Sequence, residues 1–190
     1  MYRPTLFYLL SAALVATAHA GVMPRATTSD PFQIYAYGES IGGMPLISSG
    51  KSAYLGRYDF LNDTEAAPVI FTSDDDGVWT GAPNTTDLGD SSDPPTWSNL
   101  TFSVPAASSS SHAVALVDPS KNSTSNLITS NFGFYGTFIY VTGTGGEMET
   151  LWYAVATDTD GIYELRWNTT GDEGKDLILL TLKSSPPSNA

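Results

Sequence analysis

The chain contains no cysteine, and this absence excludes several kinds of chemistry at once. Disulfide bridges, thiol nucleophiles, zinc–thiolate sites and iron–sulfur ligation all need residues that are not there. The fold must therefore be stabilised by packing and hydrogen bonding, with glycans or a bound metal as the remaining additions.

Basic residues are scarce: 8 Lys and Arg stand against 20 Asp and Glu, which gives a formal net charge of -12. Nucleic acid and anionic membranes are repelled by such a surface, so we expect neither as a partner. Acidic clusters at residues 74–76, 87–93 and 172–176 are interpreted as solvated surface that keeps an extracellular protein soluble.

Histidine is almost absent, and this limits nucleophilic catalysis. The chain has two histidines, of which His19 falls in the leader segment described next. His112 is then the one imidazole available to a Ser-His-Asp relay, and it follows the serine run 108–111 at a loop-to-strand junction. We expect no such triad and assign no catalytic residue.

No apolar run is long enough to cross a bilayer, which takes about 20 residues. The longest run, residues 6–15, follows the single basic residue Arg3 and precedes Ala18-His19-Ala20. This three-part pattern predicts a secretory signal peptide over residues 1–20. We therefore expect a secreted protein, extracellular or associated with the cell wall. The polar C-terminal residues argue against a glycolipid anchor, which needs an apolar tail there.

The rest of the chain shows short apolar or alternating runs broken by Gly, Pro, Asn and Asp, which is typical of β-structure. We predict a flexible N-terminal arm over 21–31, a single β domain over 32–183 and a disordered tail over 184–190. The expected fold is an all-β antiparallel β-sandwich, with a closed barrel or a β-trefoil-like fold as the alternative. About eleven strands are expected, at 32–37, 44–47, 53–55, 69–72, 78–80, 100–104, 113–117, 138–141, 151–156, 162–167 and 177–182.

Two Asp-Gly dipeptides predict tight hairpins, because Asp-Gly readily adopts the positive φ angles of such turns. Asp160-Gly161 separates the alternating runs 152–157 and 162–167, and Asp76-Gly77 repeats the pattern earlier in the chain. In the second run Tyr163, Leu165 and Trp167 fall on one face, and we expect that face to be buried.

Residues 32–38, 50–56 and 157–168 resemble a group of small secreted glycoproteins of filamentous fungi that have no assigned function. The resemblance spans most of the mature chain and rests on short motifs. It implies fungal secretion and supplies no catalytic residue.

Five N-x-[ST] sequons predict N-glycosylation of a secreted chain on exposed loops. Their acceptors are Asn62, Asn84, Asn99, Asn122 and Asn168.

The Asp-x-Asp-Gly turns also offer carboxylates to calcium, a hard cation that binds oxygen ligands. The candidate ligands are Asp74 and Asp76 in one turn and Asp158 and Asp160 in the other. Neither turn continues into the twelve-residue loop ending in Glu that would make the motif specific. Calcium is the one cofactor considered, and hairpin turns are the plainer interpretation.

Aromatic residues are plentiful, and exposed rings on a β-fold can stack on sugar faces. Trp79, Trp152 and Trp167 are expected in the core. Trp97, in a Pro-rich loop, is the tryptophan expected to be least buried and is the candidate for carbohydrate stacking.

These observations favour a non-enzymatic extracellular glycoprotein that binds carbohydrate or a protein partner at the cell wall or outside the cell. The alternative is a carboxylate-based hydrolase or lyase acting on polysaccharide, which needs two carboxylates across a cleft. Candidate carboxylates near strand ends are Glu39, Asp59, Glu147, Glu149 and Glu164.

Overall fold

A computed structural model describes residues 30–88, 93–172 and 176–188 of the chain. The predicted signal peptide and all but the last two residues of the predicted arm lie outside the described residues. In the described part, no helix is long and apolar enough to span a membrane.

Six strands close into an antiparallel barrel. Around the barrel they follow the order β1-β2-β3-β13-β12-β14, and β14 pairs back onto β1. Their bounds are β1 (Tyr35–Gly38), β2 (Ile41–Ser48), β3 (Ala53–Leu55), β12 (Trp152–Ala156), β13 (Tyr163–Trp167) and β14 (Leu177–Lys183).

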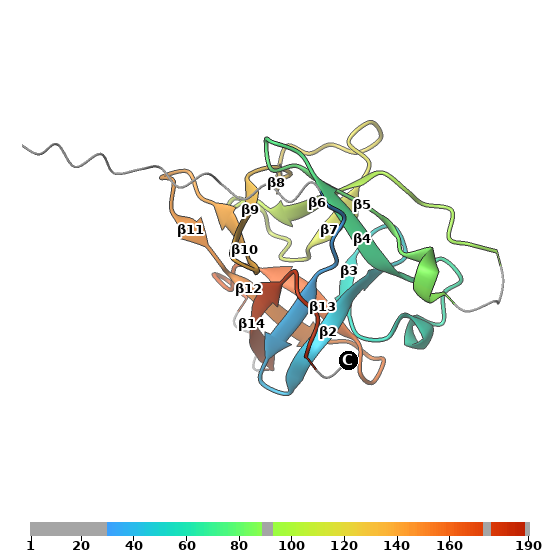
Figure 1. Cartoon of the computed structure of the whole chain (residues 1–190). Helices are drawn as coiled ribbons and strands as arrows, with labels where there is room; N and C mark the ends of the chain where they lie inside the picture. The colour runs from blue at the N-terminus through green and yellow to red at the C-terminus, as the bar shows by residue number, and fades with distance from the viewer. Residues whose placement is uncertain (1–29, 89–92, 173–175, 189–190) are drawn as a thin grey trace, which may run out of the picture.

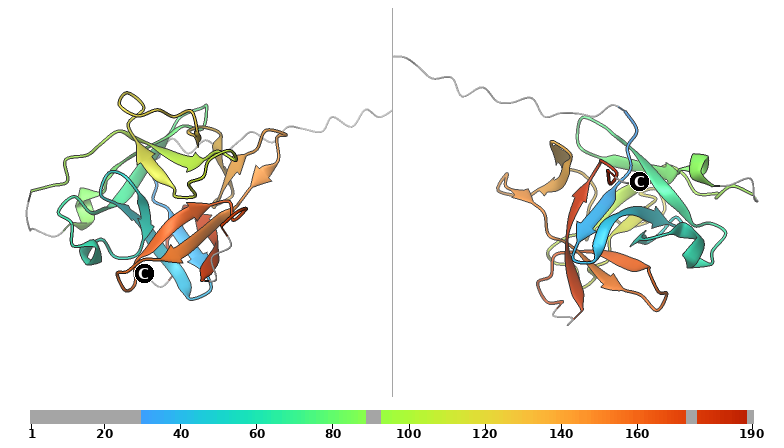
Figure 2. Two further views of the ribbon diagram at one scale, coloured as in Figure 1. Left: turned by 180° about the vertical axis from the view of Figure 1, so that it is seen from behind. Right: turned by 60° about the horizontal axis from the view of Figure 1, so that its bottom comes forward.

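The remaining strands lie outside the barrel. From β2 the sheet continues through β4 (Ala67–Ser73), β5 (Trp79–Pro83), β6 (Leu100–Pro105) and β7 (Ala115–Val117), with β8 (Leu127–Ile128) paired to β6. At β14 it continues into β10 (Phe138–Thr142), which also pairs with β9 (Phe132–Tyr135) and β11 (Met148–Glu149). Two short 3-10 helices, η1 (Tyr58–Leu61) and η2 (Thr85–Asp87), lie in loops. Figure 1 and the left view of Figure 2 show the green-to-yellow strands stacked on the blue, cyan and red barrel strands.

The all-β prediction is confirmed, and the chain adopts the closed barrel that was the alternative to a sandwich. The residue pattern could not separate the two, because alternation along a strand is the same whether or not the sheet closes. Closure is decided by β1, which pairs with β2 on one side and with β14, far along the chain, on the other. Each expected strand overlaps an observed one; the strands that were missed are β8, β9 and β11.

An aromatic cluster fills the space between the barrel and the outer sheet. Five phenylalanine rings have centroids within 6.5 Å of the Trp79 ring. Trp152 continues the cluster, with Phe102 at 6.2 Å and Trp167 at 4.4 Å. All three tryptophans predicted for the core are at most 3% exposed. This cluster of large rings takes the place of disulfides in holding the two layers together.

Both predicted Asp-Gly hairpins are present. Gly161 (φ 76°) turns the chain between β12 and β13, and Gly77 (φ 70°) turns it between β4 and β5. Only the glycine of each pair takes a positive φ. On β13, Leu165 and Trp167 are buried and Tyr163 packs partly buried against the core, as the alternation predicted.

The residues after β14 contact the barrel as far as the structure describes them. The Ser184 amide donates to the Thr137 carbonyl, and the Tyr37 hydroxyl donates to the Ser185 carbonyl. Pro187 lies against Gly43 of β2. These contacts involve Ser184, Ser185 and Pro187 of the predicted tail, and residues 189 and 190 lie outside the described part.

Candidate binding site: an aromatic face across four strands

One row of side chains crosses four neighbouring strands on the outer surface. Tyr35 of β1 lies opposite Lys183 of β14, Lys183 lies opposite Phe138 of β10, and Phe138 lies opposite Tyr135 of β9. Residues directly opposite each other in a sheet point to the same face. Because adjacent strands are about 4.8 Å apart, the row spans about 14 Å. We call this row, together with Tyr37 and the residues that line the adjacent groove, the aromatic face.

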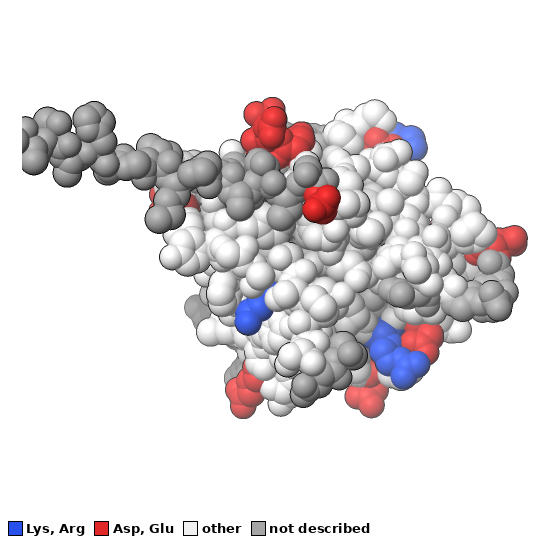
Figure 3. Space-filling model, viewed as in Figure 1, with Lys and Arg blue, Asp and Glu red and all other residues white. Residues whose placement is uncertain are grey.

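The row is open to solvent at its β9–β10 end. Tyr135 is 70% exposed and Phe138 is 45% exposed, and both flank a two-residue turn in which Gly136 takes a positive φ of 62°. Scattered exposed apolar side chains are ordinary, but rings gathered in one row mark a contact surface. Figure 3 shows this side of the molecule with most acidic side chains toward the margins of the view and mainly uncharged side chains around one basic patch in the area of β10 and β14.

Beside the row lies a groove of about 290 Å³ that is mainly apolar. Its floor and walls come from β10, β11 and β14, and Met148 at its rim is 58% exposed. In the described part of the chain no hydrogen bond is made by the hydroxyls of Thr150 and Thr181, which also line the groove. The groove thus combines ring faces with hydroxyl groups. Its lining residues are Tyr135, Phe138, Ile139, Tyr140, Met148, Thr150, Thr181 and Leu182.

A lysine sits inside the row. The Lys183 ammonium lies 4.7 Å from the centroid of the Tyr37 ring and 4.9 Å from that of Phe138. Each such cation–π contact contributes about 0.5–1 kcal/mol at an exposed site. Tyr37 is itself fixed by its hydrogen bond to the Ser185 carbonyl. The two rings therefore hold the cation at the middle of the aromatic face.

Sequence reasoning missed this face because it missed β9. Gly133 lies inside β9 and Gly136 in the turn after it, and glycine is depleted in strands. The usable signal was the alternation of Phe132 and Phe134 on the buried side before a Gly-containing two-residue turn.

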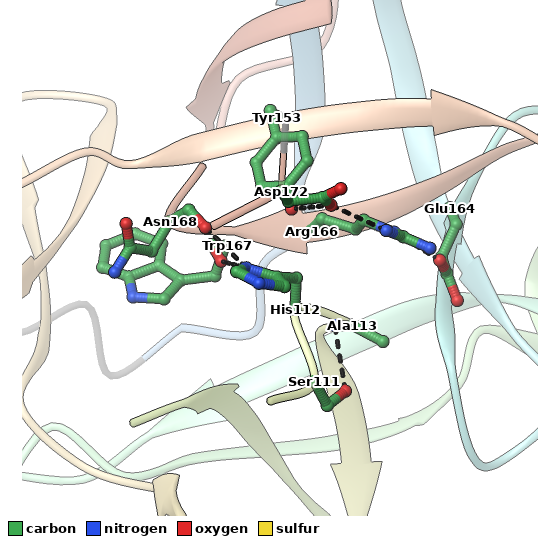
Figure 4. A network of polar contacts seen from close by, with 9 residues as sticks. All are labelled: Ser111, His112, Ala113, Tyr153, Glu164, Arg166, Trp167, Asn168 and Asp172. Atoms are coloured by element: carbon green, nitrogen blue, oxygen red, sulfur yellow. Dashed lines mark hydrogen bonds and ion pairs between the residues drawn. The ribbon is translucent and has the colours of Figure 1, made fainter. Parts of the chain in front are cut away.

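A second candidate surrounds His112, the one histidine in the described part of the chain. Its Nδ1 lies 2.6 Å from the Asn168 carbonyl oxygen and 3.3 Å from that of Trp167. A neutral ring must therefore carry its proton on Nδ1 to donate to these carbonyls. In return, the Trp167 amide donates to the His112 carbonyl. Figure 4 shows the ring directing its nitrogen toward the Trp167 and Asn168 carbonyl oxygens at the end of β13, with Ser111 pointing away from it.

A polar network lies next to this histidine, as Figure 4 also shows. Arg166 donates to Glu164 at 2.6 Å and to Asp172 at 2.7 Å, and the Tyr153 hydroxyl donates to Asp172 at 2.5 Å. The hydrogen bonds from Tyr153 and Arg166 lower the pKa of Asp172. Burial, and then the hydrogen bond to Asp172, raise the pKa of Tyr153. These hydrogen bonds favour the ionised form of Asp172 and the neutral form of Tyr153, and the network braces the segment after β13.

The His112 surroundings do not form a nucleophilic site. The nearby hollow, about 130 Å³, is lined by Ser109 and Ser111, but their hydroxyls accept from the backbone amides of Ser111 and Ala113. In the described residues no serine hydroxyl bonds to the imidazole.

Sequence reasoning also missed a Gly-x-Ser-x-Gly stretch at residues 38–42. In α/β hydrolases this motif forms a strand-to-helix elbow that exposes a nucleophilic serine. Here Ser40, with a positive φ of 61°, lies in the two-residue turn between β1 and β2. The described residues place no histidine against its hydroxyl. The motif is therefore a hairpin turn.

Two of the candidate carboxylates for polysaccharide cleavage, Glu147 and Glu149, lie together, and the other three lie on separate elements. Asp59 pairs with Arg57 at 2.7 Å, and Glu164 pairs with Arg166. Glu147 and Glu149 lie together beside Gly143, on the face of β11 opposite Met148 and hence away from the groove. Glu39 is exposed in the β1–β2 turn.

Trp97 is the most exposed of the four tryptophans, as expected, but its ring also makes contacts within the fold. Its ring lies against Gly50 and packs partly buried against the core. Its indole N–H donates to the Glu65 carbonyl at 2.8 Å. Sugar stacking at Trp97 stays a prediction, and the aromatic face offers more exposed rings.

The two Asp-rich segments form hairpin turns. The Asp74 carboxylate accepts from the amides of Asp76 and Val78, which closes the β4–β5 turn. Asp158 and Asp160 lie exposed in the β12–β13 turn. Over the described ranges, no group of three or more His, Cys, Asp or Glu side chains could hold a metal ion. Calcium binding at these turns stays a prediction.

The sequon asparagines lie on loops, turns and strand ends in the described structure. Asn62, Asn99 and Asn122 are exposed, whereas Asn84 and Asn168 are half-buried. The side-chain oxygens of Asn84 and Asn168 accept from Thr86 and Thr170 amides in tight turns. Glycosylation itself stays a prediction.

A larger hollow, about 360 Å³, lies between η1 and η2. It borders Leu88 and Asp93, which flank residues outside the described part, so its outline is incomplete and it carries no assignment.

No family model matches the chain, and no match is found among curated proteins or among solved structures. The function must therefore be argued from the site itself.

Proposed function

We propose that this protein is a non-enzymatic glycan-binding protein that acts outside the cell, and that the aromatic face is its binding surface. The observation that carries the proposal is the cross-strand row in which exposed Tyr135 and Phe138 lie side by side. Secretion, inferred from the leader pattern and the sequons, places such a protein where extracellular polysaccharide is found.

The chemistry of the face suits a sugar. Pyranose rings present an apolar surface of C–H groups that packs on aromatic rings, while their hydroxyls need polar partners at the edge. Tyr135 and Phe138 provide the rings, and Thr150, Thr181 and Lys183 provide the polar groups beside them. Since the row spans about 14 Å across its strands, it is wider than one sugar ring and fits a short stretch of oligosaccharide.

A binding function is favoured over cleavage because Glu147 and Glu149, the candidate acids that lie together, are not among the residues that line the groove. Glycosidic hydrolysis needs one carboxylic acid held protonated next to a second carboxylate. Asp172 accepts from Tyr153 and Arg166, and these hydrogen bonds lower its pKa, while Glu164 is paired with Arg166. Neither lines the groove.

The proposal is tested with a glycan array and a pull-down on insoluble polysaccharides, run beside an assay for reducing-sugar release. We expect the wild type to bind a subset of glycans, Tyr135→Ala to lose most of that binding, and neither protein to release sugar ends. Phe60→Ala is the matched control, because Phe60 is an exposed ring on η1, away from the face.

Two outcomes contradict the proposal. Release of reducing ends that disappears in Glu164→Gln would show an enzyme. Capture of a protein partner through the aromatic face, with no glycan bound, would replace the sugar by a protein surface.

A further inference from the structure

We propose that the glycan bound by the aromatic face carries a carboxylate, as a uronic acid does, and that Lys183 pairs with it. This inference rests on the proposed function and adds the class of sugar to it.

Lys183 has no counter-ion among the residues that the structure describes. In the described part of the chain no carboxylate oxygen lies within 4.0 Å of its ammonium. The contacts that hold it are the rings of Tyr37 and Phe138. Ring faces attract a cation but leave its N–H donors without acceptors, so the ammonium keeps the capacity to bind an anion.

Of the other four basic residues in the described part of the chain, three form ion pairs and Lys51 does not. Arg57, Lys121 and Arg166 each form an ion pair with a nearby acid, at 2.6 to 3.0 Å. Acidic residues outnumber basic ones 20 to 8, so a surface cation readily finds a partner. Lys183 instead lies between two rings inside an exposed aromatic row. Its ammonium is therefore available to a negatively charged group of a bound ligand.

The position of the Lys183 ammonium along the row also favours a role in binding. Lys183 lies directly opposite Phe138 on the neighbouring strand and two strands away from Tyr135. A sugar stacked on Tyr135 and Phe138 therefore projects the substituents of its next residue toward the ammonium. Neutral hydroxyls can accept from a lysine, but a carboxylate gains a charge-assisted bond that is about twice as strong.

The net charge of the protein narrows the ligand further. A polymer with an acid on every residue would be repelled by the formal charge of -12 over about 10 Å at moderate salt. An otherwise neutral glycan with an occasional acid avoids most of that repulsion and still meets Lys183. The inferred class is a neutral backbone with sparse uronic acid groups.

The test uses matched probes that differ in the acid alone. Xylo-oligosaccharides with and without a glucuronic acid branch form one pair, and a soluble glucan before and after partial oxidation of its C6 hydroxyls to carboxylates forms the other. Calorimetry or affinity electrophoresis compares the wild type with Lys183→Gln, Lys183→Arg and Lys51→Gln. Lys51 is the control, because it is a second exposed lysine without an ion pair in the described residues but lies outside the aromatic face.

We expect the wild type to bind the acidic member of a pair roughly threefold to tenfold more tightly than the neutral member. Lys183→Gln should lose this preference, because its affinity for the acidic member falls more than its affinity for the neutral member, and the preference of the wild type should weaken with added salt. Lys183→Arg and Lys51→Gln should retain it. Unchanged melting temperatures show that each variant is folded.

Failure of the inference and failure of the proposed function give different results. Equal binding of acidic and neutral members, or a preference that survives in Lys183→Gln, overturns the role of Lys183 and leaves glycan binding in place. Absence of binding to every glycan of the array and to both probe pairs overturns the proposed function and this inference with it.

Discussion

Phe138 and Lys183 lie directly opposite each other, and through this pair β10 is joined to β14. The Lys183 ammonium stacks over the Phe138 ring at 4.9 Å, and the Ser184 amide then donates to the Thr137 carbonyl. The hairpin that carries the exposed rings is thus attached to the barrel beside the residue that supplies the cation. The proposed binding surface and the barrel therefore meet at one strand pair.

Truncation of Phe138 should reduce binding without unfolding the protein. Phe138→Ala removes a 45% exposed ring from the middle of the row, and we expect affinity for the bound glycan to fall about tenfold, or about 1.4 kcal/mol. Phe60→Ala removes a ring of similar exposure, 46%, on η1 and should leave affinity unchanged. Isothermal titration calorimetry measures both. Equal losses in the two variants would contradict a binding role for the row.

Closure of the barrel can be tested at two glycines of the β1–β2 hairpin. A Cβ at Gly38 would lie 2.6 Å from the Leu179 carbonyl oxygen of β14, whereas a Cβ at Gly42 would have no atom within 4 Å. Gly38→Ala should cost about 1–3 kcal/mol by overpacking. For a chain of this size that lowers the melting temperature by several degrees, about 2–4 °C per kcal/mol.

Gly42→Ala is the matched control and should change the free energy of unfolding by less than about 0.5 kcal/mol. A tolerated Gly38→Ala, with the melting temperature of the wild type, would contradict the β1–β14 pairing.

Trp79 should be the most costly ring to remove. It is 1% exposed and is surrounded by five phenylalanines, so Trp79→Ala leaves a large cavity between the two layers. We expect a loss of about 3–5 kcal/mol in the free energy of unfolding, measured by urea denaturation. A loss below about 1 kcal/mol would mean that the layers are held by other contacts.

The Asp172 network should make stability depend on acid. Hydrogen bonds from Tyr153 and Arg166 lower the pKa of Asp172 in the folded protein. A carboxyl with a lowered folded pKa stabilises the fold fully above its ordinary pKa, near 3.9, and loses that contribution as the pH falls through the folded value. The wild type should therefore exceed Asp172→Asn in melting temperature at neutral pH, and the gap should shrink below about pH 4.

The measurement is a series of thermal melts of both proteins from neutral to acidic pH. A gap that stays constant over this range would show that Asp172 contributes through packing alone.

The sequence predicted local structure well and the site poorly. Asp160-Gly161 predicted a hairpin because turn chemistry is local, and Leu165 and Trp167 predicted a buried face because alternation is local. The pairing of Tyr35 with Lys183 joins residues at opposite ends of the domain. Nothing in the spacing of either segment specifies that partner, since barrel closure and an open sheet need the same alternation. The row of rings exists only because that closure brings β1, β14, β10 and β9 together.

Trp97 illustrates the same limit. Its Pro-rich loop suggested exposure, but the ring is covered by Gly50, a residue 47 positions earlier, and its N–H is taken by the Glu65 carbonyl. Composition indicates how polar a segment is and not which distant residue packs on it.

The most direct test of the binding surface is a titration of isotope-labelled protein with a bound glycan, followed by amide chemical shifts. We predict that the shifts concentrate on β9, β10 and β14, around Tyr135, Phe138 and Lys183. Shifts that instead cluster around His112 or Trp97, with the β9–β10 hairpin unaffected, would contradict the aromatic face as the site of binding.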